Sequence, residues 1–314
     1  MMIRPQYKLR IGGTNTRLGI RTIIMGVLNV TPDSFSDGGL YVEPRRAVQH
    51  ALTMAREGAD WVDIGGESNR PGSLPVSVEE ELRRVVPVIR GLRRSMPHLP
   101  ISIDTTKAAV AREALRAGAN ILNDISGLRF DPQIADLARR SRAPLVLMHL
   151  RGRPATMQQR PFVRSIARSL SRGLAWSVKQ ALHRGVWRSQ LIIDPGLGFG
   201  KTRRQNLEII AYLDRLQKFQ LPVMVGASRK SFVRAIAAGD GLDPSCKTAT
   251  SAAGRPLAVD SSVCGPGNHH LDFADAGTAA AAVLAGAHIV RVHSVSAVLP
   301  AVRIADAILA TRRG

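Results

Sequence analysis

Cysteine, aromatic side chains and long apolar runs are all scarce in this sequence, and each scarcity excludes a class of protein. The 314 residues include two cysteines, Cys246 and Cys264, too few for a disulfide framework or a Cys-x-x-Cys metal site. No apolar run approaches the ~20 residues that span a membrane. The first residues, MMIRPQYKLRIGG, lack the apolar segment of a secretory signal. We therefore expect a cytoplasmic protein without a membrane partner.

Acidic residues are also few. Lys and Arg total 44 while Asp and Glu total 24, which gives a formal net charge of +20. Such a charge could serve nucleic-acid binding, but the basic residues are dispersed over helical stretches. Aromatic residues, which stack on bases, make up only 4% of the chain. We therefore expect no nucleic-acid partner, and note that a polyanionic substrate such as a diphosphate would also suit this charge.

Short runs rich in Val, Ile and Leu alternate along the chain with helical patterns, as is typical of strands covered by helices. The predicted strands are 22–29, 60–65, 100–104, 120–124, 144–149, 190–194, 222–227 and 288–293. Predicted helices include 44–57 and 78–95. Ser77 precedes the second helix and Glu80 follows three residues later, which is the pattern of a capping box.

Three similar joints, EGADWVDIG, AGANILNDI and AGAHIVRVH, connect a helix to a strand. Gly58, Gly118 and Gly286 in these joints fit the left-handed position that ends a helix. Repeated helix–Gly–strand joints indicate βα units in series, and the strands together predict a single-domain (β/α)₈ barrel. A doubly wound open sheet is the alternative, although no G-x-G-x-x-G follows the first strand.

The predicted domain organisation has an N-terminal extension over 1–21 and the barrel over 22–314. Residues 240–272 interrupt the barrel before its last helix–strand unit, and they carry Gly, Pro and Ser with no clear period. The segment is too long for a plain connector, so we expect a flexible insertion. A lid over the site is the alternative.

Every predicted strand ends in polar or charged side chains. A single such residue is as readily explained by a cap or turn, but in a barrel the carboxyl ends of the strands carry the chemistry. The joint pattern therefore favours a functional site. The strand-end residues are Asn29, Asp63 with Glu67, Asp104, Asn123 with Asp124, His149, Asp194, Ser228 to Lys230, and Arg291 with His293.

Two chemical groups can be separated among these residues and their neighbours. Asp104, Asn123 and Asp194 supply acceptors and an amide, which suit the donor-rich edge of a flat heterocycle. Asn29 supplies a hard oxygen that, with diphosphate oxygens and waters, would complete a magnesium shell. A second group is cationic and suits phosphate oxygens. The cations are Arg70, Lys230, Arg291 and His293.

Two further features have simpler interpretations. GLGFGK (196–201) lacks the spacing of a P-loop, so we predict a βα loop over the site with Phe199 packing on the ligand. His149 follows an apolar run, and a core histidine is a simpler interpretation than a ligand.

Several long motifs follow one another in a fixed order between about Met25 and His293. They are MGVLNVTPDSFSDGG, DIGGESNRPG, ISIDTTKAAVA, NDISG, LMHLRGRPATMQ, IIDPGLGFGKT, GASRKSF and RVH. This series resembles the signature stretches of the dihydropteroate synthases, which are pterin-binding enzymes. Only the insertion interrupts the resemblance.

The resemblance implies a (β/α)₈ barrel, usually a homodimer, that acts in folate biosynthesis. It implies condensation of para-aminobenzoate with 6-hydroxymethyl-7,8-dihydropterin diphosphate, which releases diphosphate with the help of Mg²⁺. Asn29 would bind the magnesium. The pterin would be held by Asp104, Asn123, Asp194 and Lys230, and the diphosphate by Asn29, Arg291 and His293. The aminobenzoate pocket would be bordered by Arg70, Pro71, Phe199 and Ser228, and Asn69 would bind substrate from the same loop as Arg70. Loops carrying Asp33, Ser34, Phe35 and Arg70 would cover the site.

The difficult step in this reaction is the expulsion of diphosphate from a methylene carbon, because an aromatic amine is already neutral at pH 7. Lys230, Arg291 and His293 are therefore the expected catalytic residues, since cations and a metal stabilise charge on the leaving group. We expect no covalent enzyme intermediate and no essential general base.

The chain departs from the family pattern at three places. Asn69 stands where the family has Thr, Ser294 where it has Asp, and DFADAGT replaces an Arg-containing stretch. Two alternatives therefore stay open: a divergent paralogue that binds pterin without synthase activity, and a pterin-binding methyltransferase domain. The second has no need of diphosphate cations or of the loop carrying Phe35.

Overall fold

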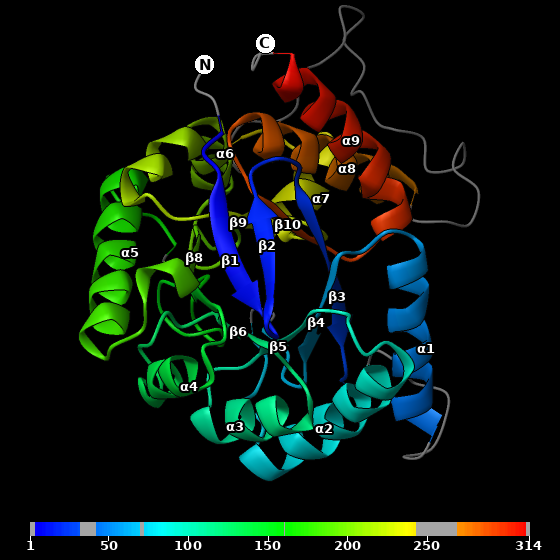
Figure 1. The fold of residues 1–314 in the computed structure, drawn as a ribbon. Helices are drawn as coiled ribbons and strands as arrows, with labels where there is room; N and C mark the ends of the chain where they lie inside the picture. Colours follow the sequence, from blue (N-terminus) through cyan, green and yellow to red (C-terminus); the bar gives the residue numbers. More distant parts are fainter. Residues whose placement is uncertain (1–3, 32–41, 70–71, 160, 243–268, 312–314) are drawn as a thin grey trace, which may run out of the picture.

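The computed structural model describes residues 4–31, 42–69, 72–159, 161–242 and 269–311. In these ranges the chain forms a ring of parallel strands surrounded by helices (Figure 1). The predicted loop cover, Asp33, Ser34 and Phe35, lies outside the described residues, as do Arg70, Pro71 and both cysteines.

The barrel wall is an eight-stranded sheet with the order β8-β7-β6-β5-β4-β3-β10-β9. Its strands are β3 (Ile23–Asn29), β4 (Trp61–Gly65), β5 (Ile101–Asp104), β6 (Ile121–Asp124), β7 (Leu145–Met148), β8 (Leu191–Asp194), β9 (Met224–Val225) and β10 (Ile289–Val292). A parallel bridge between Ile193 and Val223 joins the two edge strands and closes the ring. The predicted barrel is therefore confirmed, and the open-sheet alternative is wrong.

Strand β9 is shorter than the predicted 222–227. It ends at Val225, and a turn in which the Lys230 amide donates to the Ala227 carbonyl at 3.2 Å follows it. This early turn brings the residues after β9 to the mouth of the barrel.

Helices cover the outside of the barrel, as the alternating pattern predicted. They are α1 (Val42–Arg56), α2 (Val78–Ser95), α3 (Ala108–Ala117), α4 (Gln133–Ser141), α5 (Ile166–His183), α6 (Arg203–Ala211), α7 (Ser231–Ala237), α8 (His269–Leu284) and α9 (Val295–Ala310), with 3-10 turns η2 (Arg188–Gln190) and η3 (Leu213–Phe219). Among these helices, none has the length and apolar content to cross a bilayer.

The helix ends follow local sequence signals. Gly58, Gly118 and Gly286 have φ values of 107°, 120° and 108°, which confirms the left-handed position predicted for each.

Only half of the predicted capping box forms at α2. The Ser77 hydroxyl accepts from the Glu80 amide at 3.2 Å, whereas the Glu80 carboxylate pairs with two arginines one turn further along the helix.

Two apolar layers result from the alternation of side chains along each strand. In β3, for example, Ile24 and Leu28 join the large core between the strands and the helices, while Ile23 and Met25 join a second cluster inside the barrel. This inner cluster is formed at the amino ends of the strands. The carboxyl ends are therefore left for polar side chains.

A β-hairpin covers the amino end of the barrel. Strands β1 (Tyr7–Ile11) and β2 (Thr14–Leu18) pair antiparallel and lie across the ring of strands (Figure 1). Leu9, Ile11 and Leu18 pack into the inner cluster. The sequence predicted only an extension over 1–21, so this closing element is a finding of the structure.

The predicted insertion over 240–272 needs one correction at its end. Helix α8 begins at His269, so residues 269–272 are helical, because Leu271 and Ala274 already follow the helical period and pack against the core. Residues 243–268 lie outside the described residues.

The hairpin yields a stability prediction. Leu18 is fully buried (0% exposed), so Leu18→Ala opens a cavity against the barrel interior and should lower the free energy of unfolding by about 2–5 kcal/mol. Ile20→Ala is the control, because Ile20 is 49% exposed and its truncation should cost less than about 0.5 kcal/mol. Urea unfolding measures both, and equal effects would contradict the assignment of the hairpin as part of the core.

Candidate functional site

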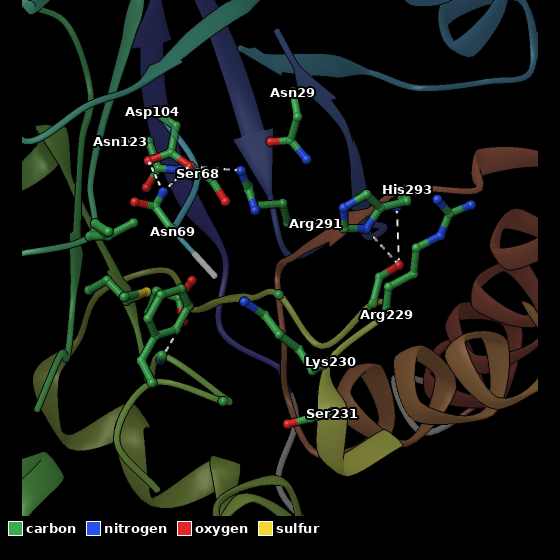
Figure 2. A pocket seen from close by; sticks show the side chains of 18 of the residues that line it. Asn29, Ser68, Asn69, Asp104, Asn123, Arg229, Lys230, Ser231, Arg291 and His293 are labelled. Carbon is green, nitrogen blue, oxygen red and sulfur yellow. Dashed lines mark hydrogen bonds and ion pairs between the residues drawn. The ribbon is translucent and has the colours of Figure 1, made fainter. Parts of the chain in front are cut away.

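A cavity of about 440 Å³ lies at the carboxyl end of the barrel (Figure 2). It brings together every described residue that the sequence predicted for the site. These are Asn29, Asn69, Asp104, Asn123, Asp194, Phe199, Ser228, Lys230, Arg291 and His293. Thus side chains that are up to 264 positions apart in sequence share one pocket, as a barrel topology requires.

Other strand-end residues do not line the cavity and have structural roles. Asp124 accepts hydrogen bonds from the amides of Ser126 and Leu128 at 2.8 and 2.6 Å, so it shapes the turn after β6. Glu67 forms an ion pair with Lys107. His149 is 2% exposed, and burial lowers its pKa to about 2, as expected for a neutral core histidine.

One guanidinium connects three strands across the mouth of the barrel. Arg291, on β10, donates from Nε to Asp63 on β4 at 2.6 Å and from a terminal nitrogen to Asp104 on β5 at 2.9 Å. Asp63 also accepts from Asn123 Nδ2 at 3.0 Å. The ion-pair network therefore holds Asp104 and Asn123 in a defined orientation beside Arg291.

Asp104, Asn123 and Asp194 form a buried side of the cavity that we call the acceptor wall. Burial raises the pKa of Asp104, and it raises that of Asp194 to about 6. The Asn123 Oδ1 atom is buried and has no hydrogen-bond partner among the described residues. A buried acceptor without a partner is costly, so this wall suits a ligand that supplies N–H donors.

Another part of the cavity lining is apolar. Ile125, Met148, Met157 and Phe199 pack together there. The Lys230 ammonium lies 4.0 Å from the centroid of the Phe199 ring, in a cation–π contact. A flat aromatic ligand can therefore lie between the acceptor wall and this apolar surface.

A buried lysine fixes the loop that carries Phe199. Lys201 donates from Nζ to the carbonyls of His149, Gly196 and Phe199 at 3.0, 2.7 and 3.0 Å. Burial lowers its pKa to about 7. The lysine of GLGFGK thus holds the βα loop in place and does not line the cavity, whereas Gly196, Gly198 and Phe199 of the same loop do.

Comparison with known proteins places these features in a family. A profile of the pterin binding enzyme family matches residues 25–293. The chain belongs to this family. It is 42% identical over 300 residues to the dihydropteroate synthase of Synechocystis, and the aligned residues cover 96% of this chain and 94% of that protein. It is 38% identical over 292 residues to the dihydropteroate synthase of Escherichia coli, with 92% of each chain covered.

Solved structures of dihydropteroate synthases also resemble this chain in fold. A Xanthomonas albilineans dihydropteroate synthase with 4-aminobenzoic acid matches with a TM-score of 0.81 at 36% identity, covering 98% of this chain and 99% of the other. The same enzyme in complex with 7,8-dihydropteroate gives a TM-score of 0.77 at 34% identity, and the match covers 96% of this chain and 99% of the other. The family resemblance expected from the motifs is confirmed, and these relatives are transferases.

The departures from the family pattern fall in different places. Asn69 lies in the cavity, where its amide nitrogen is 3.3 and 3.4 Å from the two carboxylate oxygens of Asp104 (Figure 2). Ser294 precedes α9 and does not line the cavity. The third departure, DFADAGT, lies in α8 and includes Asp275, whose carboxylate accepts from the hydroxyl of the cavity residue Ser228 at 2.6 Å. Asn69 therefore lines the cavity directly, whereas DFADAGT contacts it through Ser228.

Several cavity residues were not predicted. Ile125, Met148 and Met157 resemble core residues in sequence, while Ser231 lies in the GASRKSF stretch after β9 and Arg234 lies two residues beyond that stretch. The signal for the last two was their proximity to Lys230. No comparable signal marks the apolar residues, because an apolar residue after a strand is most often core.

A double-mutant cycle tests the network around Arg291. Asp63→Asn and Arg291→Met should each destabilise the fold, and the double mutant should lose less than the sum, with a coupling energy of about 0.5–3 kcal/mol in urea unfolding. The partly exposed pair Arg184 and Asp136, 2.9 Å apart, is the matched control and should couple by less than about 1 kcal/mol. Additive effects at Asp63 and Arg291 would contradict a shared network.

Proposed function

We propose that this protein is a dihydropteroate synthase that joins para-aminobenzoate to 6-hydroxymethyl-7,8-dihydropterin diphosphate and releases diphosphate. The observation that supports it best is one cavity that combines the acceptor wall with Lys230, Arg291 and His293. The acceptor wall alone would suit any pterin-binding barrel. The cations beside it suit a substrate that also carries a diphosphate.

The pterin would lie with its donor-rich edge on the acceptor wall. Two carboxylates can accept its N–H groups, and the Asn123 oxygen without a partner can accept another. Lys230 would face the ring from the loop side, where its cation–π contact with Phe199 already orders it. Burial of these groups favours ligand hydrogen bonds, because water cannot compete for them.

Asn29 is the described residue that would hold a magnesium ion. Its Oδ1 atom and Asp104 Oδ2 both approach the space above Gly65, 3.7 and 3.8 Å from where a Cβ of that residue would lie. The described residues contain no cluster of three His, Cys, Asp or Glu that could hold a metal unaided. This fits Mg²⁺, which usually takes few protein ligands and shares substrate phosphates. The ion would neutralise charge on the departing diphosphate.

The protein's own part in the reaction is to position and stabilise. Arg291 and His293 would bind the diphosphate oxygens as negative charge grows on them. The apolar surface around Phe199 would hold the aminobenzoate ring, with its carboxylate near Ser231 and Arg234 at the cavity rim. The neutral amine attacks the methylene carbon directly, so no covalent enzyme intermediate and no essential general base are involved.

A homodimer in the cytoplasm is also part of this proposal. Helices α8 and α9 expose large apolar side chains, Phe273, Ile304 and Ile308, which are 74%, 65% and 41% exposed. Exposed apolar groups on adjoining helices suit a contact between copies. Light scattering of the purified protein would measure the mass directly.

Turnover is the decisive test of function. Purified protein with pterin diphosphate, para-aminobenzoate and Mg²⁺ should form 7,8-dihydropteroate, measured by chromatography. A binding-only paralogue would bind the pterin in calorimetry and form no product. A methyltransferase domain would bind the pterin with and without its diphosphate equally well, and either result would overturn the proposal.

Pterin binding should depend on pH through Asp194. Its raised pKa of about 6 means that below this pH the free carboxyl is protonated and must lose a proton to accept a pterin N–H. Affinity should therefore fall as pH falls, by up to about tenfold per pH unit. Calorimetry with 6-hydroxymethyl-7,8-dihydropterin, which carries no phosphate, isolates this effect.

Asp194→Asn is the matched variant for this measurement. It should bind the pterin more weakly at pH 8, because an amide is a poorer acceptor than a carboxylate. Its affinity should also change less steeply with pH, since one titrating proton is missing. Identical pH slopes in the two proteins would rule out the carboxylate as the pterin-binding group.

A further inference from the structure

A buried carboxylate contacts the site indirectly, through one serine. Asp275, on α8, is 2% exposed and does not line the cavity. The Ser228 hydroxyl donates to Asp275 Oδ2 at 2.6 Å. The same Ser228 oxygen lies 3.1 Å from His293 Nδ1 and 3.2 Å from the His293 amide nitrogen. Figure 2 shows the two contacts of His293 as dashed lines.

The number of protons on the serine decides the direction of these bonds. A hydroxyl has one proton and two lone pairs, and an ionised carboxylate can only accept. The proton of Ser228 therefore goes to Asp275, which leaves its oxygen as an acceptor. Both contacts with His293 must then be donated by the histidine, one from its amide and one from Nδ1–H.

We propose that Asp275 is a positioning residue that, through Ser228, holds His293 in the tautomer that carries its proton on Nδ1. This inference rests on the proposed function, in which His293 binds the diphosphate. With Nδ1 engaged by Ser228, Nε2 is the ring nitrogen on the far edge of the imidazole. The ring can take up a proton at Nε2 and donate a hydrogen bond to a diphosphate oxygen without turning.

The backbone supports the same arrangement. Asp275 also accepts from the Arg229 amide, at 3.0 Å to Oδ1 and 3.2 Å to Oδ2. Arg229 has a φ of 58°, a left-handed conformation that is uncommon for a residue other than glycine. One carboxylate thus holds both the turn after β9 and the serine within it. This explains why the serine oxygen is available only as an acceptor.

Replacing Asp275 with Asn should change the tautomer of His293 specifically, because Asn can still hydrogen-bond both Ser228 and the Arg229 amide. The amide oxygen of Asn must accept from the Arg229 amide, so its NH₂ group faces Ser228 and donates to it. The Ser228 proton then turns to His293 Nδ1, which must become an acceptor. The neutral ring of His293 should therefore change to the tautomer protonated on Nε2.

Nitrogen-15 NMR of the full-length protein labelled at histidine measures this directly. Spectra at about pH 9, well above the usual histidine pKa of about 6.5, report which ring nitrogen carries the proton. We expect Nδ1–H for His293 in the unmodified protein and Nε2–H in Asp275→Asn. His293→Gln identifies the signal. An unchanged tautomer in Asp275→Asn would overturn the proposal.

Steady-state kinetics provide the second measurement. Asp275→Asn should lower kcat by about 10-fold to 100-fold, the usual effect of losing the partner that orients an active-site histidine. The KM for aminobenzoate should stay within about twofold, because Asp275 does not itself line the cavity and Asn at this position keeps a hydrogen bond to Ser228. A different result would indicate a structural role and overturn the proposal: KM rises by as large a factor as kcat falls, the melting temperature drops, and the tautomer of His293 does not change.

Two further variants keep the test decisive. Asp272→Asn removes a neighbouring carboxylate of α8, one whose charge acts on Asp275, and should leave both the tautomer and kcat unchanged. If Asp275→Asn does not fold, Ser228→Ala removes the connection instead, and a persisting Nδ1–H signal would then contradict the proposal. Because the NMR measurement needs no turnover, failure to make dihydropteroate would refute the proposed function and leave the tautomer assignment standing.

Discussion

The ion pairs of Arg291 are the interaction on which the site depends. Asp63 and Asp104 are buried on adjacent strands, at 0% and 5% exposure, and two carboxylates so placed repel each other unless a cation lies between them. The guanidinium that satisfies them comes from β10, on the far side of β3 in the sheet. The same group that would bind the substrate's phosphates therefore also sets the orientation of the pterin-binding side chains.

A second constraint follows from the first. Because the carboxyl end of the barrel carries many polar and charged groups and only a small apolar cluster, most of the apolar residues that stabilise the ring lie elsewhere. They occupy the amino end, where the hairpin covers them, and the space between strands and helices. Stability and function are thus separated along the axis of the barrel. Lys201 is an exception, since it uses a buried charge to hold the loop of Phe199.

Much of this arrangement could be predicted from the sequence, because strand positions and strand-end residues follow local patterns. The limits are physical. Asn123 and Asp124 are neighbours in β6, and neighbouring side chains of a strand point to opposite faces, so only one could line the cavity. The sequence does not reveal which one.

Contacts between distant segments are a second limit. Asp275 lies 47 positions from Ser228, on a helix, and no spacing rule connects them. In the hairpin, β1 alternates Tyr7, Leu9 and Ile11 with two basic residues, a period-2 strand signal that was missed because the strand is only five residues long, whereas β2 is mostly polar and carries no such signal.

Closing the amino end of the barrel has a consequence for the order of events. With the hairpin in place, the cavity has its mouth on the carboxyl side, and everything must pass through it. The acceptor wall is buried at the bottom, whereas Arg229, Ser231 and Arg234 are exposed at the rim. A molecule seated at the rim would block the passage to the bottom. Under the proposed function, the pterin would therefore enter before the aminobenzoate, and diphosphate would leave past the rim where the second substrate would bind.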